Sequence, residues 1–119
     1  MNGNARFFEI EAQSLQYFVT DGTAPVAGVS TANLGSLPGV RRGAITIPAG
    51  SKKIIVTAPI LSEGTRVVQY EMLDAASENN LFARLSFPAP GQFAISLYDT
   101  AGVPFTTTID HDFQFAILI

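Results

Sequence analysis

The stretch that decides the fold is Gly43-Ala-Ile-Thr-Ile-Pro-Ala-Gly-Ser-Lys-Lys-Ile-Ile-Val-Thr-Ala-Pro59. In its first half, Ile45 and Ile47 alternate with small or polar neighbours, which is the two-residue period of a half-buried strand. Residues 48–51 are turn residues, because proline fixes φ and glycine accepts a positive φ. The β-branched residues 54–56 then resume extended structure. The stretch therefore predicts two strands joined as a hairpin.

Short alternating segments recur on both sides of this hairpin, separated by turn residues such as Asp21-Gly22. About nine or ten short strands at this spacing, with no helix of three turns, predict an all-β antiparallel sandwich, for which the jelly roll is one compatible topology. The other predicted strands cover residues 6–11, 14–20, 65–72, 81–87, 92–98, 103–109 and 113–119. Val68, Tyr70 and Met72 are predicted to share one strand face. The predicted inward residues of the later strands include Leu81, Ala83, Leu85, Phe87, Phe93, Ile95 and Leu97.

Residues 21–43 differ from the rest of the chain, because glycine and proline punctuate them and small residues fill the gaps. A loop of this length is unusual inside a compact domain. We expect a single domain in which residues 1–42 form an N-terminal strand pair plus a Gly/Pro-rich arm, and residues 43–119 form the sandwich core. The preferred interpretation is an arm lying on a neighbouring subunit. Loop length favours a surface loop of the same chain equally.

Low charge is the most informative feature of the composition. Of the 119 residues, 47% are hydrophobic and only 14% are charged, against about 25% charged in an average globular protein. A surface so poor in charge indicates that a partner covers part of it. Short β proteins rich in Thr, Ser and Gly share this composition, which leaves the opposite interpretation open.

Several classes of partner and chemistry lack the residues that they need. The net charge is −3, and Arg41-Arg42 and Lys52-Lys53 are the only paired cations, whereas nucleic-acid binding needs several cations on one face. Cysteine is absent, which excludes disulfides and thiolate chemistry. No apolar run approaches the roughly 20 residues of a membrane span. No signal-peptide core follows the polar N-terminus.

The candidate catalytic groups are few. The sole histidine lies in Asp110-His111-Asp112, where two carboxylates beside an imidazole could bind a metal or tune a base. In extended geometry these three side chains alternate between faces and cannot all converge on one ion. The favoured interpretation is therefore structural, a polar turn between two strands. Glu9 and Glu11 share one strand face and could serve glycoside chemistry, but such pairs more often protect an edge strand. We expect no enzyme activity, catalytic residue, cofactor or metal site.

Apolar and aromatic side chains on otherwise polar faces indicate an interface, because interface centres favour aromatic residues and exclude charge. The opposing interpretation is a strand buried on both faces. Tyr17, Tyr70, Tyr98 and Phe82 are also candidate platforms for a sugar. The interface candidates are Phe7, Phe18, Val26, Leu34, Leu37, Arg41, Arg42, Phe82 and Ile119.

Three segments carry a family resemblance: Ile45-Thr-Ile-Pro-Ala-Gly50, Ile54-Ile-Val-Thr57 and Phe113-Gln-Phe-Ala-Ile-Leu-Ile119. Over residues 43–119 the chain resembles small β-sandwich structural proteins of tailed bacteriophages, such as capsid decoration (cement) proteins and tail or fibre modules. The resemblance implies symmetric oligomers, often trimers, with arms that reach neighbouring subunits. It provides no catalytic residues.

The function expected from these features is that of a non-enzymatic virion protein on the capsid surface. It would be made in the host cytoplasm, form a homotrimer and bridge subunits of the major capsid protein, with no nucleic-acid or membrane partner. A receptor- or glycan-binding module of a phage tail or fibre is the alternative. Activity that depends on His111 would instead indicate a small enzyme.

Overall fold

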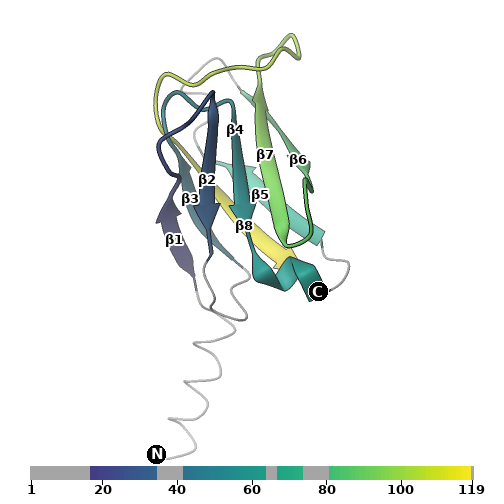
Figure 1. Ribbon diagram of the computed structural model, residues 1–119. Coiled ribbons are helices and arrows are strands. Elements are labelled where there is room, and N and C mark those ends of the chain that lie inside the picture. The colour runs from purple at the N-terminus through teal and green to yellow at the C-terminus, as the bar shows by residue number, and fades with distance from the viewer. Residues whose placement is uncertain (1–16, 35–41, 64–66, 74–80, 119) are drawn as a thin grey trace, which may run out of the picture.

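The computed structural model describes residues 17–34, 42–63, 67–73 and 81–118. The strands in this part of the chain form two four-stranded sheets that pack face to face (Figure 1). The predicted all-β sandwich is therefore confirmed. The elements are β1 (Phe18–Asp21), β2 (Val29–Asn33), β3 (Arg42–Ile47), β4 (Lys53–Thr57), the 3-10 helix η1 (Pro59–Glu63), β5 (Val67–Met72), β6 (Phe82–Ser86), β7 (Gln92–Tyr98) and β8 (His111–Leu118).

The two sheets are mixed rather than purely antiparallel. Sheet A has the strand order β1-β3-β8-β5, and sheet B has the order β2-β4-β7-β6. β1 runs parallel to β3 and β2 runs parallel to β4, whereas the other four pairs are antiparallel. The antiparallel prediction is thus wrong for the two N-terminal pairs. The reason is that the chain alternates between the sheets from β1 to β4. β3 therefore enters sheet A in the same direction as β1, and β4 enters sheet B in the same direction as β2.

The predicted hairpin at residues 43–57 is a β-arch. β3 and β4 belong to different sheets, and the turn between them carries the chain across the sandwich. The turn itself is as predicted, because Gly50 has a φ of 89°. Ile45, Ile47, Ile54 and Val56 are all fully buried, so the two strands direct their apolar faces toward the shared core instead of pairing edge to edge.

A second arch precedes the first. β1 and β2 also lie in different sheets, and residues 18–33 stack on residues 42–57 with Phe18 beside Gly43 and Val29 beside Lys53. Gly43 permits this close approach, because a Cβ there would overlap the carbonyl oxygen of Phe18. Only a residue without a side chain fits where the two parallel strands meet.

Part of the predicted arm therefore belongs to the sandwich. Residues 29–33 form β2, and Leu34, just after this strand, is 1% exposed in the core. The arm prediction is wrong for this stretch, because its small residues pair with β4 and cover the core from one flank. The predicted strand over residues 6–11 and the arm residues 35–41 lie outside the described part of the chain.

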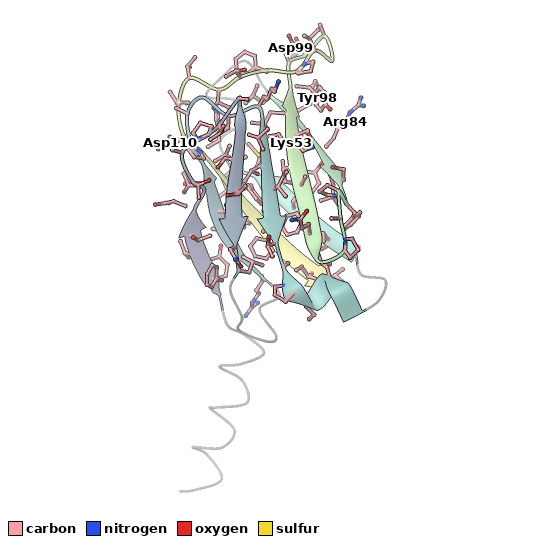
Figure 2. All side chains as sticks on the ribbon, viewed as in Figure 1. Lys53, Arg84, Tyr98, Asp99 and Asp110 are labelled. Carbon is pink, nitrogen blue, oxygen red and sulfur yellow. The ribbon has the colours of Figure 1, made fainter. Side chains whose placement is uncertain are left out.

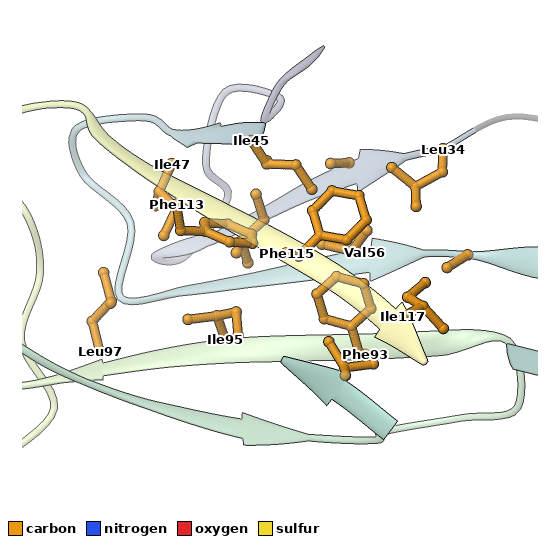
Figure 3. Packing of buried hydrophobic residues seen from close by; sticks show 14 of the residues in the cluster. Leu34, Ile45, Ile47, Val56, Phe93, Ile95, Leu97, Phe113, Phe115 and Ile117 are labelled. Carbon is orange, nitrogen blue, oxygen red and sulfur yellow. The ribbon is translucent and has the colours of Figure 1, made fainter. Parts of the chain in front are cut away.

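The core joins the two sheets through aromatic and branched side chains (Figure 3). Phe93 of β7 and Phe115 of β8 meet across it, with ring centroids 5.7 Å apart. The predicted inward residues of β7 are confirmed, since Phe93, Ile95 and Leu97 are fully buried. Phe87 is 53% exposed, so its predicted burial is wrong, because β6 ends one residue earlier.

The chain between β7 and β8 also differs from the prediction. Residues 103–109 form no strand, and only an isolated bridge joins Pro104 to Tyr98. Proline lacks the N–H that a full ladder requires. His111 does not lie in a polar turn: it begins β8 and is fully buried.

Candidate functional site

The Asp110–Asp112 segment holds the turn of the central arch in place. The Asp110 carboxylate accepts a hydrogen bond from Ala49 N at 2.8 Å. The Asp112 carboxylate accepts one from Thr46 Oγ1 at 2.6 Å. Both aspartates are exposed whereas His111 is buried on the opposite face. The predicted alternation is confirmed, and these three side chains do not converge on one ligand.

The interface candidates that fall within the described residues lie in different parts of the molecule. Phe18 is half-buried and packs against the core, and Arg42 lies beside it at the start of β3. Val26, 78% exposed, lies in the β1–β2 connection, whereas Phe82, 56% exposed, lies in β6 at the opposite edge of sheet B. Leu34 belongs to the core and is no surface candidate. Phe7, Leu37, Arg41 and Ile119 lie outside the described residues.

The outer edge of β2 is covered by the chain's own β1–β2 connection. Val29 exchanges two backbone hydrogen bonds with Val26, at 2.9 and 3.0 Å. Thr31 O accepts from Thr23 N at 2.8 Å, and Thr31 N donates to Thr23 Oγ1 at 3.1 Å. These bonds occupy backbone groups that an edge strand would otherwise offer to another chain. The edge of sheet B is therefore closed at these residues.

The outer edge of β1 has no such cover within the described residues. Gly22 N donates to Thr46 O at 2.7 Å, so the backbone N–H of Gly22 points toward β3. Because backbone groups alternate in direction along a strand, the N–H and C=O of Val19, three residues earlier, point away from β3. The side chain of Val19 is 68% exposed and that of Tyr17 is 48% exposed. Within the described residues, the β1 edge of sheet A, on the left of Figure 1, thus combines uncovered backbone groups with exposed apolar side chains.

A hollow of about 310 Å³ lies on sheet A beside this edge. We call it the Arg42 hollow. It crosses β3, β8 and β5, where Arg42 pairs with Ala116 and Glu71 pairs with Gln114. It brings together groups of both charge signs and two side-chain amides, those of Gln69 and Gln114. Its lining is Tyr17, Arg42, Gln69, Tyr70, Glu71, Gln114, Phe115 and Ala116.

A second hollow, of about 420 Å³, lies at the β6 edge of sheet B. We call it the Tyr98 hollow. Phe82 lies directly opposite Tyr98 in the strand register, and the Arg84 guanidinium lies 5.1 Å from the centroid of the Tyr98 ring. Sequence analysis found both aromatic residues but missed Arg84, which the i, i+2 spacing from Phe82 could have identified. The lining is Phe82, Ala83, Arg84, Tyr98, Asp99, Thr100, Ala101 and Gly102.

Comparisons of the chain with protein-family models, with curated proteins and with solved structures each gave no match. Among the described residues, no group of three or more His, Cys, Asp or Glu side chains is placed to hold a metal ion. No helix in this part of the chain is long and apolar enough to cross a membrane. What the protein does is therefore inferred from its own residues.

Proposed function

We propose that the protein is a non-enzymatic virion structural protein, a capsid decoration protein that assembles as a homotrimer and stabilises the head by bridging capsid subunits. The observation that supports this function is the edge of β1, which no described residue covers and beside which Val19 and Tyr17 are exposed. Unprotected edge strands pair readily with other chains. The low charge content and the resemblance to small phage sandwiches favour the same function.

The other sheet edges are better protected. β5 carries Glu71 and β6 carries Arg84 within the strand, and charged side chains on an edge oppose pairing with a second chain. β1 has no charged residue before Asp21 at its end. Of the described sheet edges, the β1 edge is thus the most suitable contact for a neighbouring subunit.

Three copies close into a ring only through a contact between two different surfaces. Sheet A offers such a pair, the β1 edge and the Arg42 hollow. In the proposed trimer, the β1 edge of one copy lies on the Arg42 hollow of the next. A contact between two β1 edges would use one surface twice and would produce a dimer, so the solution mass distinguishes the two arrangements.

The test is the substitution Val19→Lys, measured by light scattering on a sizing column. The wild-type protein should have the mass of three 12.7 kDa chains. The variant should be a folded monomer, because Val19 is 68% exposed, so that lysine there leaves the fold intact, and because the new charge opposes burial of the β1 edge against a neighbouring copy. Val103→Lys is the matched control, since Val103 is 54% exposed in the loop after β7, and it should remain trimeric.

Two results would contradict this proposal. A wild-type monomer or dimer would exclude the proposed trimer. A trimeric Val19→Lys variant would show that the β1 edge does not form the contact.

The second candidate function is a receptor- or glycan-binding module of a phage tail or fibre. The observation that favours it is the Tyr98 hollow, where Phe82 is exposed beside Tyr98 and Arg84. An exposed aromatic ring next to a fixed hydrogen-bond donor is suited to a ligand that has both an apolar face and polar groups.

A further inference from the structure

We propose that the outer face of sheet B binds a carboxylated glycan, with a sugar ring on Phe82 and its carboxylate between Arg84 and Lys53. This inference rests on the second candidate function and does not require the trimer. Figure 2 shows Lys53, Arg84 and Tyr98 on this sheet, with Asp99 in the loop beyond Tyr98. The hollow of about 420 Å³ is lined by Phe82 and Arg84 and does not include Lys53, which lies beyond Ser96 on the same sheet. Its volume falls within the size range of small-molecule sites.

Two cations form a row across this face. Lys53 of β4 and Arg84 of β6 both pair with Ser96 of β7, so their Cα atoms lie two strand spacings apart, about 10 Å. Their neighbours Ile54 and Ala83 turn inward, which places both basic side chains on the outer face. The small Ser96 side chain between them leaves the floor open. In a chain of net charge −3, this local excess of positive charge favours an anionic ligand.

Tyr98 holds Arg84 in position. The guanidinium lies 5.1 Å from the centroid of the phenol ring, a distance at which a cation is attracted to the ring face. A guanidinium restrained in this way loses less conformational entropy when it binds. Its parallel N–H groups match the two oxygens of a carboxylate. Arg84 therefore provides the charge-specific contact.

Phe82 provides the apolar contact. Its side chain is 56% exposed and lies directly opposite Tyr98 on the same face. The negative face of an aromatic ring attracts the C–H groups of a sugar ring, and the contact also removes apolar surface from water. A carboxylated sugar satisfies both neighbouring residues, because it combines such C–H groups with an anion.

The loop beside the hollow is formed before any ligand binds. The Asp99 carboxylate accepts hydrogen bonds from Ala101 N at 2.9 Å and from Val103 N at 3.0 Å. Gly102 N donates to Asp99 O at 3.0 Å, and a φ of 80° suits glycine there. The Asp99 carboxylate, the one carboxylate in the lining, thus accepts hydrogen bonds from its own loop. A rim that is already ordered lowers the entropic cost of binding.

The test uses three carboxylated glycans, namely oligogalacturonate, a hyaluronate octasaccharide and a sialic-acid homopolymer, in calorimetric titrations. Each is compared with a form whose carboxylates are methyl-esterified or reduced. At least one should bind with a Kd below about 1 mM. Its blocked form should bind about tenfold or more weakly, because a charge-assisted hydrogen bond is lost.

Matched variants locate the site. Arg84→Gln and Phe82→Ala should each weaken binding about tenfold, and Lys53→Gln should weaken it less. Phe87→Ala is the control for Phe82→Ala, because Phe87 is 53% exposed beyond the other end of β6. Lys52→Gln is the control for Lys53→Gln, because it removes the same charge from the turn before β4. Neither control should change the Kd.

Three results would overturn the proposal. They are no binding of any probe below about 1 mM, equal binding of the blocked forms, and equal losses in Lys52→Gln and Lys53→Gln. If Phe82→Ala abolishes the oligomer while no glycan binds, this face is instead a contact between copies. If the monomeric Val19→Lys variant binds the glycan with the same Kd as the wild-type protein, the glycan site does not depend on the proposed assembly.

Discussion

Two fully buried serines differ in whether their hydroxyl groups are satisfied. Ser30 Oγ donates to Thr23 O at 2.7 Å, whereas Ser51 Oγ has no hydrogen-bond partner in the described structure. A buried hydroxyl without a partner costs about 1–3 kcal/mol. We therefore expect Ser51→Ala to leave the free energy of unfolding unchanged or to increase it, as measured by urea denaturation.

Ser30→Ala is the matched comparison. It should lower the free energy of unfolding by about 1 kcal/mol or more, because Thr23 O loses its donor. If Ser51→Ala were destabilising by as much as Ser30→Ala, the Ser51 hydroxyl would have a stabilising role that this structure does not show.

At the same scale, strand periodicity predicts burial well where strands are long. Phe93, Ile95 and Leu97 face the core as expected. Continuing the two-residue period backward from Phe113 also places His111 inward, but the two flanking aspartates concealed this signal. The burial of Leu34 could not be predicted locally, because it depends on β2 lying across the core.

At the level of elements, the local signals identified strands and turns but not which strands pair. Pro48 and Gly50 are equally compatible with a hairpin and with an arch, since both need a sharp reversal. The alternation in β3 and β4 fits either arrangement, because each has one apolar face. The choice depends on β8 and β7, which are remote in sequence and occupy the neighbouring positions in the two sheets.

Thr107 clamps the turn of the central arch from the β7–β8 connection. Its Oγ1 donates to Pro48 O at 3.2 Å and accepts from Ser51 N at 3.3 Å. We expect Thr107→Val to lower the free energy of unfolding by about 1–3 kcal/mol, since the buried Ser51 N and the partly buried Pro48 O both lose their partner. Thr106→Val, at an exposed neighbouring position, should have little effect in the same urea titration. Equal effects of the two substitutions would show that the clamp contributes nothing.

For the whole molecule, strand frequency and the lack of helical periodicity were sufficient to predict a sandwich. They could not predict mixed sheets, because parallel pairing of β1 with β3 arises from the stacking of two arches. Local sequence patterns could not predict the Arg42 hollow either. It joins Arg42 to Glu71 and Gln114 through β8, across long sequence separations.

The most direct test of assembly through the β1 edge is hydrogen–deuterium exchange on the assembled wild-type protein and on the Val19→Lys monomer. Backbone amides that gain a partner at an interface exchange more slowly. We expect residues 18–21 to exchange more slowly in the assembly, with residues 82–86 of β6 unchanged. Equal exchange of β1 in both samples, or slowing confined to β6, would contradict assembly through this edge.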